Sequence, residues 1–176
     1  MIVFDTNVLI SLVTEKESSE LYERITGLIE DLVKSKTPIG IAAPSWSEFL
    51  CGTDIATFPI ISMMKKRSVI RILPFDEVAA FEAALIHRGA ISSGNKKGAS
   101  KKQWQAIKVD RQILAIARQH QVKVIYTDDG EMIAEATRLG IEAIRPSEIP
   151  LKVKQINIDF DENEQAQPKT PSSNEK

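Results

Sequence analysis

The chain has 176 residues, of which 43% are hydrophobic, and a formal net charge of −1. A chain of this length and composition can bury its own core as one domain, and its single cysteine excludes an internal disulfide. The start of the sequence carries no basic leader, and no apolar run reaches the roughly 18–20 residues that span a bilayer. We therefore expect a cytoplasmic protein that makes no membrane contact.

The first half of the chain alternates between short apolar runs and helical patterns. A strand is expected at 2–4, and the turn-forming residues Asp5-Thr6-Asn7 lead from it into a helix at residue 6 or 7. Apolar residues at helical spacing predict a helix over 17–34, which ends before Pro38. The elements that follow are, in order, a strand over 39–43, a helix from Ser45, a helix over 55–66 and a strand over 69–73.

The second half continues this alternation around one long polar segment. Residues 76–88 predict an alanine-rich amphipathic helix, and the Gly-, Ser-, Asn- and Lys-rich residues 89–100 predict a loop. The remaining elements are, in order, a helix over 102–119, a strand over 122–126, a helix from residue 128 or 129 to Gly140, and a strand over 141–144. Short strands without in-and-out alternation are typical of a parallel sheet covered on both faces. The sequence therefore predicts an α/β fold, a three-layer α/β/α sandwich with a central, mainly parallel sheet.

The last residues differ in composition from the rest of the chain. From about residue 152 onward Gln, Asn, Glu, Pro, Ser and Lys dominate, and apolar residues are nearly absent after Phe160. A segment of this kind buries too little apolar surface to offset the entropy lost on folding. We expect a folded domain over residues 1–149 and a disordered or extended tail over 150–176.

Acidic residues stand where a parallel sheet places its ligand site, which is beyond the carboxyl ends of the strands. Asp5 follows the first strand, and Glu48 lies one turn into the helix after the second. Asp128 and Asp129 follow the fourth strand, and Asp110 lies within a helix, where Asp is unfavourable. Carboxylates brought together repel one another and need a cation, and all-oxygen ligands favour Mg²⁺ or Mn²⁺. Such ions are typical of phosphodiester hydrolysis.

Each acidic residue also has a purely structural interpretation. Asp5 can cap the first helix, and Glu48 can be the acidic arm of a capping box with Ser45. One of the two aspartates after the fourth strand can cap the next helix, and Asp110 can lie at the surface. The placement of all these residues together favours a metal site over four unrelated roles.

Four segments resemble the motifs of PIN domains, in the order in which that family has them. Residues 2–7 (IVFDTN) are similar to the first motif, an apolar strand that runs into Asp-Thr-Asn. Residues 44–50 (PSWSEFL) resemble the second acidic motif, and residues 108–117 (KVDRQILAIA) resemble the third, an Asp followed by an aliphatic helix. Residues 124–129 (VIYTDD) resemble the fourth, a strand followed by Thr-x-Asp. The likeness spans about residues 1–149.

The resemblance implies a metal-dependent endoribonuclease that uses Mg²⁺ or Mn²⁺ to hydrolyse RNA. The catalytic and metal-binding quartet it implies is Asp5, Glu48, Asp110 and Asp129. Asn7, Thr127 and Asp128 are implied as supporting residues, with Asp128 in the x position of Thr-x-Asp. The commonest bacterial and archaeal members of the family are VapC-like toxins of type II toxin–antitoxin systems. The resemblance therefore also implies an antitoxin protein and a second copy of the chain as partners.

A basic segment precedes and enters the helix that carries Asp110, and Asp110 is the one acid among six basic residues between 94 and 111. Basic side chains around an acidic site can attract RNA through its phosphates. The residues expected to form this rim are Lys96, Lys97, Lys101, Lys102 and Arg111. Trp104 can stack on an unpaired base, whereas Trp46 is expected in the core. The alternative is an ordinary solvated loop, with Trp104 also in the core.

Other functions compete with the toxin ribonuclease. The long, lysine-rich connection before Asp110 and the polar tail depart from short toxins, which leaves open a PIN nuclease of RNA processing. A phosphatase of the haloacid dehalogenase type also has an Asp after its first strand, but it needs a second Asp where this chain has Asn7. A non-catalytic PIN-like scaffold that binds RNA or protein is disfavoured because no member of the acidic quartet is missing.

Overall fold

The computed structural model describes residues 1–52, 69–92, 94, 97 and 102–152. The helix predicted over 55–66 lies outside the described residues, and so does the tail from residue 153 onward. Of the described helices, none is both long and apolar enough to cross a membrane.

A five-stranded, entirely parallel sheet forms the centre of the protein. The strands are β1 (Ile2–Phe4), β2 (Ile39–Ala42), β3 (Ile70–Leu73), β4 (Val124–Tyr126) and β5 (Glu142–Ile144), and their order across the sheet is β3-β2-β1-β4-β5. Phe4 of β1 is in register with Ile41 of β2 on one side and with Tyr126 of β4 on the other. The central strands β1 and β2 are buried at every position because helices cover both faces. The prediction of a parallel α/β fold is confirmed.

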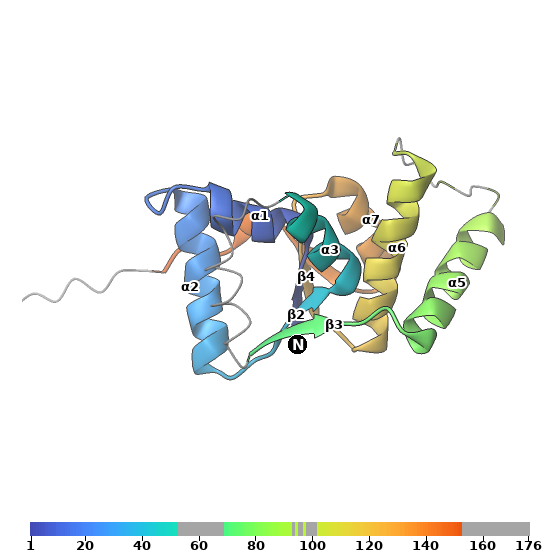
Figure 1. Cartoon of the computed structure of the whole chain (residues 1–176), viewed down its shortest axis with the longest axis horizontal. Coiled ribbons are helices and arrows are strands. Elements are labelled where there is room, and N and C mark those ends of the chain that lie inside the picture. Colours follow the sequence, from blue (N-terminus) through green and yellow to red (C-terminus); the bar gives the residue numbers. More distant parts are fainter. Residues whose placement is uncertain (53–68, 93, 95–96, 98–101, 153–176) are drawn as a thin grey trace, which may run out of the picture.

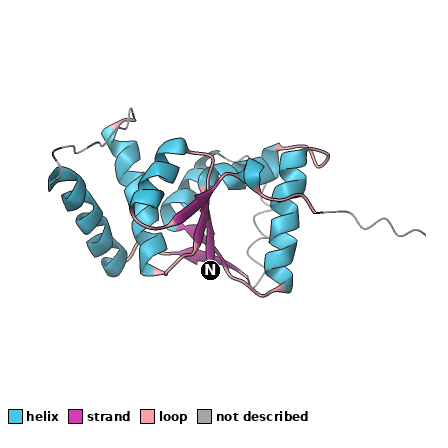
Figure 2. Cartoon of the chain, turned by 180° about the vertical axis from the view of Figure 1, so that it is seen from behind, coloured by secondary structure: helices cyan, strands magenta, loops and turns pink. Residues whose placement is uncertain are grey.

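Helices lie on both sides of the sheet, so that the protein has three layers (Figures 1 and 2). The described helices are α1 (Thr6–Thr14), α2 (Glu20–Lys34), α3 (Ala43–Gly52), α5 (Glu77–Ser92), α6 (Trp104–Gln119) and α7 (Gly130–Arg138), with a short 3-10 helix η2 (Pro146–Glu148). Apolar residues of α1, α2 and α3 form one core cluster with one face of the sheet. Apolar residues of α5, α6 and α7 form the other. Trp46 lies in the first cluster, as expected, at 9% exposure.

Several helix ends differ from their predicted positions for local reasons. Helix α2 begins at Glu20 because the Ser19 hydroxyl accepts the Tyr22 backbone N–H at 3.1 Å and caps the helix. Helix α3 begins at Ala43, before Ser45, and α5 continues to Ser92, into the segment expected to be a loop. Gly140 follows α7 with a φ of +74°, the left-handed conformation that glycine adopts readily.

The order in which strands are added to the sheet reverses next to β1, which makes this place the topological switch point of the sheet. From β1 the chain moves outward to β2 and β3, and it then returns to the other side of β1 to form β4 and β5. The connections that leave the neighbouring strands β1 and β4 therefore diverge to opposite sides of the sheet. A crevice forms at such a point, beyond the carboxyl ends of the strands, and it is where open α/β sheets bind ligands.

Candidate active site

One open pocket of about 610 Å³ lies beyond the carboxyl ends of β1, β2 and β4. Its lining includes the four acidic residues that the sequence singled out, together with one lysine: Asp5, Glu48, Asp110, Asp129 and Lys102. These residues come from the β1–α1 junction, from α3, from α6, from the β4–α7 junction and from the segment before α6. The fold therefore brings together carboxylates that are far apart in the sequence.

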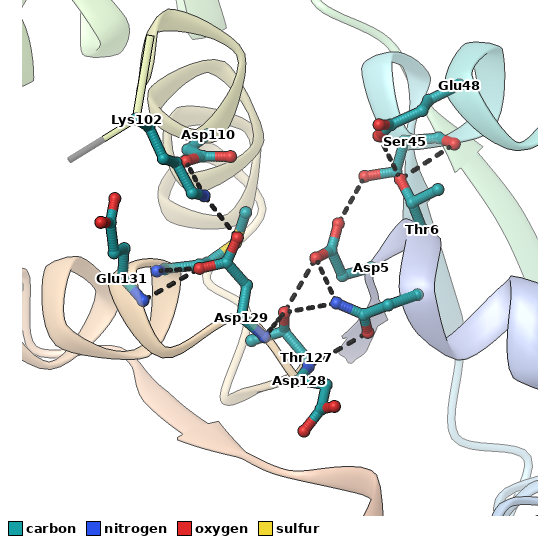
Figure 3. Close-up of polar contacts among 12 residues, drawn as sticks. Asp5, Thr6, Ser45, Glu48, Lys102, Asp110, Thr127, Asp128, Asp129 and Glu131 are labelled. Carbon is teal, nitrogen blue, oxygen red and sulfur yellow. Dashed lines mark hydrogen bonds and ion pairs between the residues drawn. The ribbon is translucent and has the colours of Figure 1, made fainter. Parts of the chain in front are cut away.

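Asp5 lies deepest among the acidic residues, with 5% of its surface exposed. Its carboxylate accepts hydrogen bonds from the Thr127 hydroxyl at 2.8 Å, the Ser45 hydroxyl at 3.1 Å and the Asn7 amide at 3.2 Å (Figure 3). The side chain makes no capping bond to α1, although Asp5 occupies the N-cap position. Asp5 is therefore the N-cap residue of α1 by position, but its carboxylate oxygens are used by side chains from three different segments.

Glu48 lies on the α3 wall of the pocket and is oriented from α1. The buried Thr6 hydroxyl donates to Glu48 Oε2 at 2.8 Å. The Ser45 hydroxyl, which a capping box would aim at its own helix, donates to Asp5 instead. Because α3 begins at Ala43, Ser45 is already inside the helix, and the predicted capping box does not form.

Asp129 and Asp110 face each other across the Lys102 side chain (Figure 3). The Lys102 ammonium donates to Asp110 Oδ2 at 2.6 Å and also forms an ion pair with Asp129 Oδ2. The other oxygen of Asp129 caps α7, since it accepts the backbone N–H groups of Glu131 at 2.9 Å and Met132 at 3.1 Å. Asp110 is thus on the pocket side of α6, and the interpretation that it lies free at the surface is wrong.

Asn7 and Thr127 connect the two sides of the pocket. The Thr127 hydroxyl, which is fully buried, donates to Asp5 and accepts the Asn7 amide at 3.1 Å and the Asp129 backbone N–H at 3.2 Å. A hydroxyl has one hydrogen to give and two lone pairs, so this one is fully used. The Asn7 side-chain oxygen accepts the Asp128 backbone N–H at 3.1 Å.

Asp128 contributes only its backbone to this network. Its side chain is exposed, points away from the pocket and forms an ion pair with Arg145 at 3.0 Å (Figure 3). Asp128 therefore supports the site through its backbone N–H, and of the two neighbouring aspartates Asp129 is the one that lines the pocket.

The pKa values of the pocket carboxylates are affected most by burial and less by neighbouring charges. Burial raises the pKa of Asp5, and the charge of Glu48 raises it further. Burial also raises the pKa of Asp110, with a contribution from Asp129, against the lowering effect of Lys102. Burial would raise the pKa of Asp129 too, but the hydrogen bonds from Lys102 and the Met132 N–H lower it overall.

The donors of the pocket have the chemistry of a site for a hard divalent cation. Four carboxylates against one ammonium leave a formal charge of −3 when all are ionised, and carboxylate oxygens are the ligands that Mg²⁺ and Mn²⁺ prefer. Within the described residues, no three Asp, Glu, His or Cys side chains are already arranged closely enough to hold an ion. The expected acidic pocket is present, and the part of the chain that the structure describes holds no preformed metal cage.

The predicted RNA-binding rim is changed most by the structure. Lys102 lies inside the acidic pocket rather than around it. Arg111 is 2% exposed, its guanidinium lies 3.1 Å from His87 Nδ1, and its expected contact with RNA is therefore wrong. Trp104 packs against the His87 ring and the Arg111 guanidinium. Lys97 donates to the Lys102 carbonyl at 3.2 Å. Lys96 and Lys101 lie outside the described residues.

Thr6 and Ser45 contact the pocket carboxylates, a placement that the sequence interpretation missed. Each hydroxyl donates to one of the pocket carboxylates and orients it. Both residues lie in the segments that resemble family motifs, beside the acidic residue in one case and one turn from it in the other. Their position close to an acidic residue in a motif could have indicated this contact, because a hydroxyl group can donate a hydrogen bond to a carboxylate.

The family model described as PIN domain matches residues 2–139, which is most of the chain. Solved structures with a similar chain include VapBC2 from Rickettsia felis bound to a DNA fragment from their promoter (17% identity, TM-score 0.57) and DNA-bound VapBC from Salmonella typhimurium (18% identity, TM-score 0.55). A toxin–antitoxin complex from Klebsiella pneumoniae is also similar, with 19% identity and a TM-score of 0.53.

The three likenesses cover 82%, 83% and 83% of this chain and 98%, 99% and 98% of the respective relatives. At these identities they show a shared fold and nothing more. No curated protein sequence matches the chain. The match to the family model over residues 2–139, on a fold of this topology, establishes that the chain belongs to the PIN domain family, whose members are nucleases.

Proposed function

We propose that the protein is a metal-dependent endoribonuclease that hydrolyses RNA phosphodiester bonds and acts as the toxin of a type II toxin–antitoxin pair. One observation carries the proposal. The carboxylates of four motif segments, which are up to 124 residues apart, line a single pocket at the switch point of the sheet. A binding scaffold without catalysis would have no need for so much uncompensated negative charge beside a polyanionic ligand.

The residues that would hold Mg²⁺ or Mn²⁺ are the four pocket carboxylates, Asp5, Glu48, Asp110 and Asp129. A divalent ion bound there would offset charge on the phosphate oxygens and lower the pKa of an attacking water. Ser45 and Thr127 fix the orientation of Asp5, and Thr6 fixes that of Glu48. Held in this way on the open wall of the pocket, Glu48 is the carboxylate best placed to orient a water and accept its proton.

An RNA substrate and a toxin role rest on different observations. The lysine-rich segment before α6, which includes Lys97 at the surface, supports attraction of a nucleic acid. The similar solved structures are toxin–antitoxin complexes, which supports an antitoxin partner for this chain. We expect such an antitoxin to cover the acidic pocket and block access to it.

Cleavage of RNA tests the enzymatic part of the proposal. Single-stranded RNA and DNA of the same sequence are incubated with the protein in Mg²⁺, in Mn²⁺ or in EDTA. Asp5→Asn removes a pocket carboxylate, and Asp31→Asn serves as the control because it removes an exposed carboxylate on α2. We expect RNA cuts that need the metal, that Asp5→Asn abolishes and that Asp31→Asn retains. Equal cleavage by wild type and Asp5→Asn would refute the assignment.

Growth after induced expression tests the toxin part. We expect growth to stop when the wild-type protein is expressed, to continue when Asp5→Asn is expressed, and to recover when the product of a neighbouring gene is expressed with the wild type. RNA cleavage in vitro without growth arrest would favour a PIN nuclease of RNA processing instead.

A further inference from the structure

Lys102 occupies a place in the pocket that the proposed reaction does not explain. Its ammonium pairs with both Asp110 and Asp129 (Figure 3). The side chain is 24% exposed, so the charge lies in the wall of the pocket and not in bulk solvent. A positive charge belonging to the chain itself is therefore held between two of the four carboxylates, where a metal ion would be expected to bind.

The contacts of Asp129 make this placement exclusive. One carboxylate oxygen is committed to capping α7, through the N–H groups of Glu131 and Met132. The other pairs with the Lys102 ammonium. A divalent ion that binds Asp129 without opening the cap must use the second oxygen, where it is repelled by the Lys102 ammonium. At Asp110 the ammonium lies 2.6 Å from Oδ2, so that an ion bound to this oxygen meets the same positive charge.

The other half of the pocket is different. In the described part of the structure, the side-chain donors to Asp5 are two hydroxyls and an amide, and the side-chain donor to Glu48 is a hydroxyl. Neutral donors orient these two carboxylates without adding a positive charge. The pocket therefore has one half with a cation of its own, Asp110 and Asp129, and one half without.

Resting on the proposed function, we propose that Lys102 is an internal competitor of the divalent ion. Its ammonium holds Asp110 and Asp129 together in the metal-free protein, and an ion that uses this pair must displace it. Ion binding is then weaker than four carboxylates alone would give, and Lys102 sets the metal concentration at which the site fills. It also keeps the empty pocket from being opened by the repulsion between its own carboxylates.

The chain offers a matched control for this proposal. Lys152 pairs with Glu30 at 2.9 Å and with Asp31 at 2.8 Å, so that it also bridges two carboxylates, but it lies outside the acidic pocket. Lys102→Met and Lys152→Met each remove one bridging ammonium. Lys102→Gln removes the charge but keeps a hydrogen-bond donor, and it guards against a Met variant that fails to fold.

Calorimetric titration of the full chain with Mn²⁺ alone, without RNA, tests the competition. We expect both Lys102 variants to bind Mn²⁺ about tenfold more tightly than wild type, and Lys152→Met to bind like wild type. In thermal melts, Lys102→Met should have a lower Tm without metal and a larger rise of Tm on adding Mn²⁺. Unchanged or weaker Mn²⁺ binding in the Lys102 variant or variants that fold would overturn the proposal.

The outcomes separate this inference from the proposed function. Metal-dependent RNA cleavage by the wild type, with Mn²⁺ affinity unchanged in the Lys102 variants, overturns only the competition. Tighter Mn²⁺ binding in those variants, with no RNA cleavage by the wild type, supports the competition and overturns only the nuclease assignment. Failure of the wild type and of all variants to bind Mn²⁺ overturns both.

Discussion

The Thr127 hydroxyl donates a hydrogen bond of 2.8 Å to the Asp5 carboxylate, across 122 residues of sequence. This bond joins the ends of the neighbouring strands β1 and β4, and the same hydroxyl accepts the backbone N–H of Asp129. The position of Asp5 relative to Asp129 therefore depends on a single buried hydroxyl. A polar group in such a place can be tested by replacing it with an apolar group of the same shape.

Thr127→Val should destabilise the protein and weaken its activity. Valine matches threonine in shape but leaves the Asp5 carboxylate and the Asn7 amide each without one partner, which costs about 1–3 kcal/mol in the free energy of unfolding. Urea denaturation measures this cost. Thr137→Val is the control, because Thr137 is exposed on α7 and donates only to its own helix at Ile133. Equal stability of the two variants would contradict the role given to Thr127.

The pH dependence of stability is expected to change in Asp5→Asn. Burial raises the pKa of Asp5 in the folded protein above the value of about 4 of an unfolded aspartate. Because the folded state then binds the proton more tightly, stability falls as the pH rises from the unfolded pKa to the folded pKa. Metal-free wild type has this loss, and Asp5→Asn lacks it.

Urea denaturation in EDTA between pH 4 and pH 8 measures this effect. The free energy of unfolding of Asp5→Asn minus that of wild type should increase as the pH rises, and then level off above the folded pKa of Asp5. Asp31→Asn, which removes an exposed carboxylate on α2, is measured beside it as the control. A difference between Asp5→Asn and wild type that does not change with pH would show that the pKa of Asp5 is not raised.

Asp129→Asn and Asp128→Asn should affect RNA cleavage very differently. Asparagine is as good an N-cap as aspartate, so Asp129→Asn keeps the cap of α7 while removing charge from the pocket. We expect its cleavage rate to fall on the order of 100-fold, because the loss of a group that supports a metal site already lowers activity by about 10- to 100-fold. Asp128→Asn removes only an exposed ion pair with Arg145 and should stay near the wild-type rate. A reversed order would move the metal ligand to Asp128.

Arg111→Met should lower the free energy of unfolding by about 2 kcal/mol. The change removes a buried guanidinium that lies 3.4 Å from the Glu135 carboxylate, which then loses this partner. Arg138→Met is the matched control, because Arg138 pairs with the same Glu135 from an exposed position, and it should cost less than about 1 kcal/mol. Chemical denaturation of the two variants gives the comparison. RNA affinity should be the same in both, and a selective loss of RNA binding in Arg111→Met would restore its predicted contact.

The sequence predicts the order of strands and helices well because short apolar runs that end in turn residues leave few alternatives. It also singles out Asp5, Glu48, Asp110 and Asp129, since two of them follow strand ends, one lies a turn into the helix after a strand, and one interrupts an apolar helix pattern. Arg111 is misjudged for a geometric reason. One residue along α6 is a rotation of about 100°, so that Asp110 faces the pocket while Arg111 faces α5 and Glu135.

Lys102 and Ser45 show a second reason why local sequence falls short. A lysine next to polar residues has the pattern of a solvated loop, and only the packing of α6 beside α7 brings its ammonium to Asp129. Ser45 and Glu48 have the spacing of a capping box, but α3 begins at Ala43, so that the serine is free to bond Asp5. In both cases the partner is distant in sequence and local spacing carries no information about it.

The topological switch point at β1 determines when the pocket can form during synthesis of the chain. The amino-terminal part, through β3, supplies Asp5 and Glu48, but the strand that completes their surroundings is β4, which starts at residue 124. A growing polypeptide whose β4 and α7 segments have not yet left the ribosome lacks Thr127 and Asp129. It also lacks the start of α7, whose N–H groups hold the Asp129 carboxylate. The pocket therefore stays incomplete until both of these segments have been made and released, however early the amino-terminal part folds.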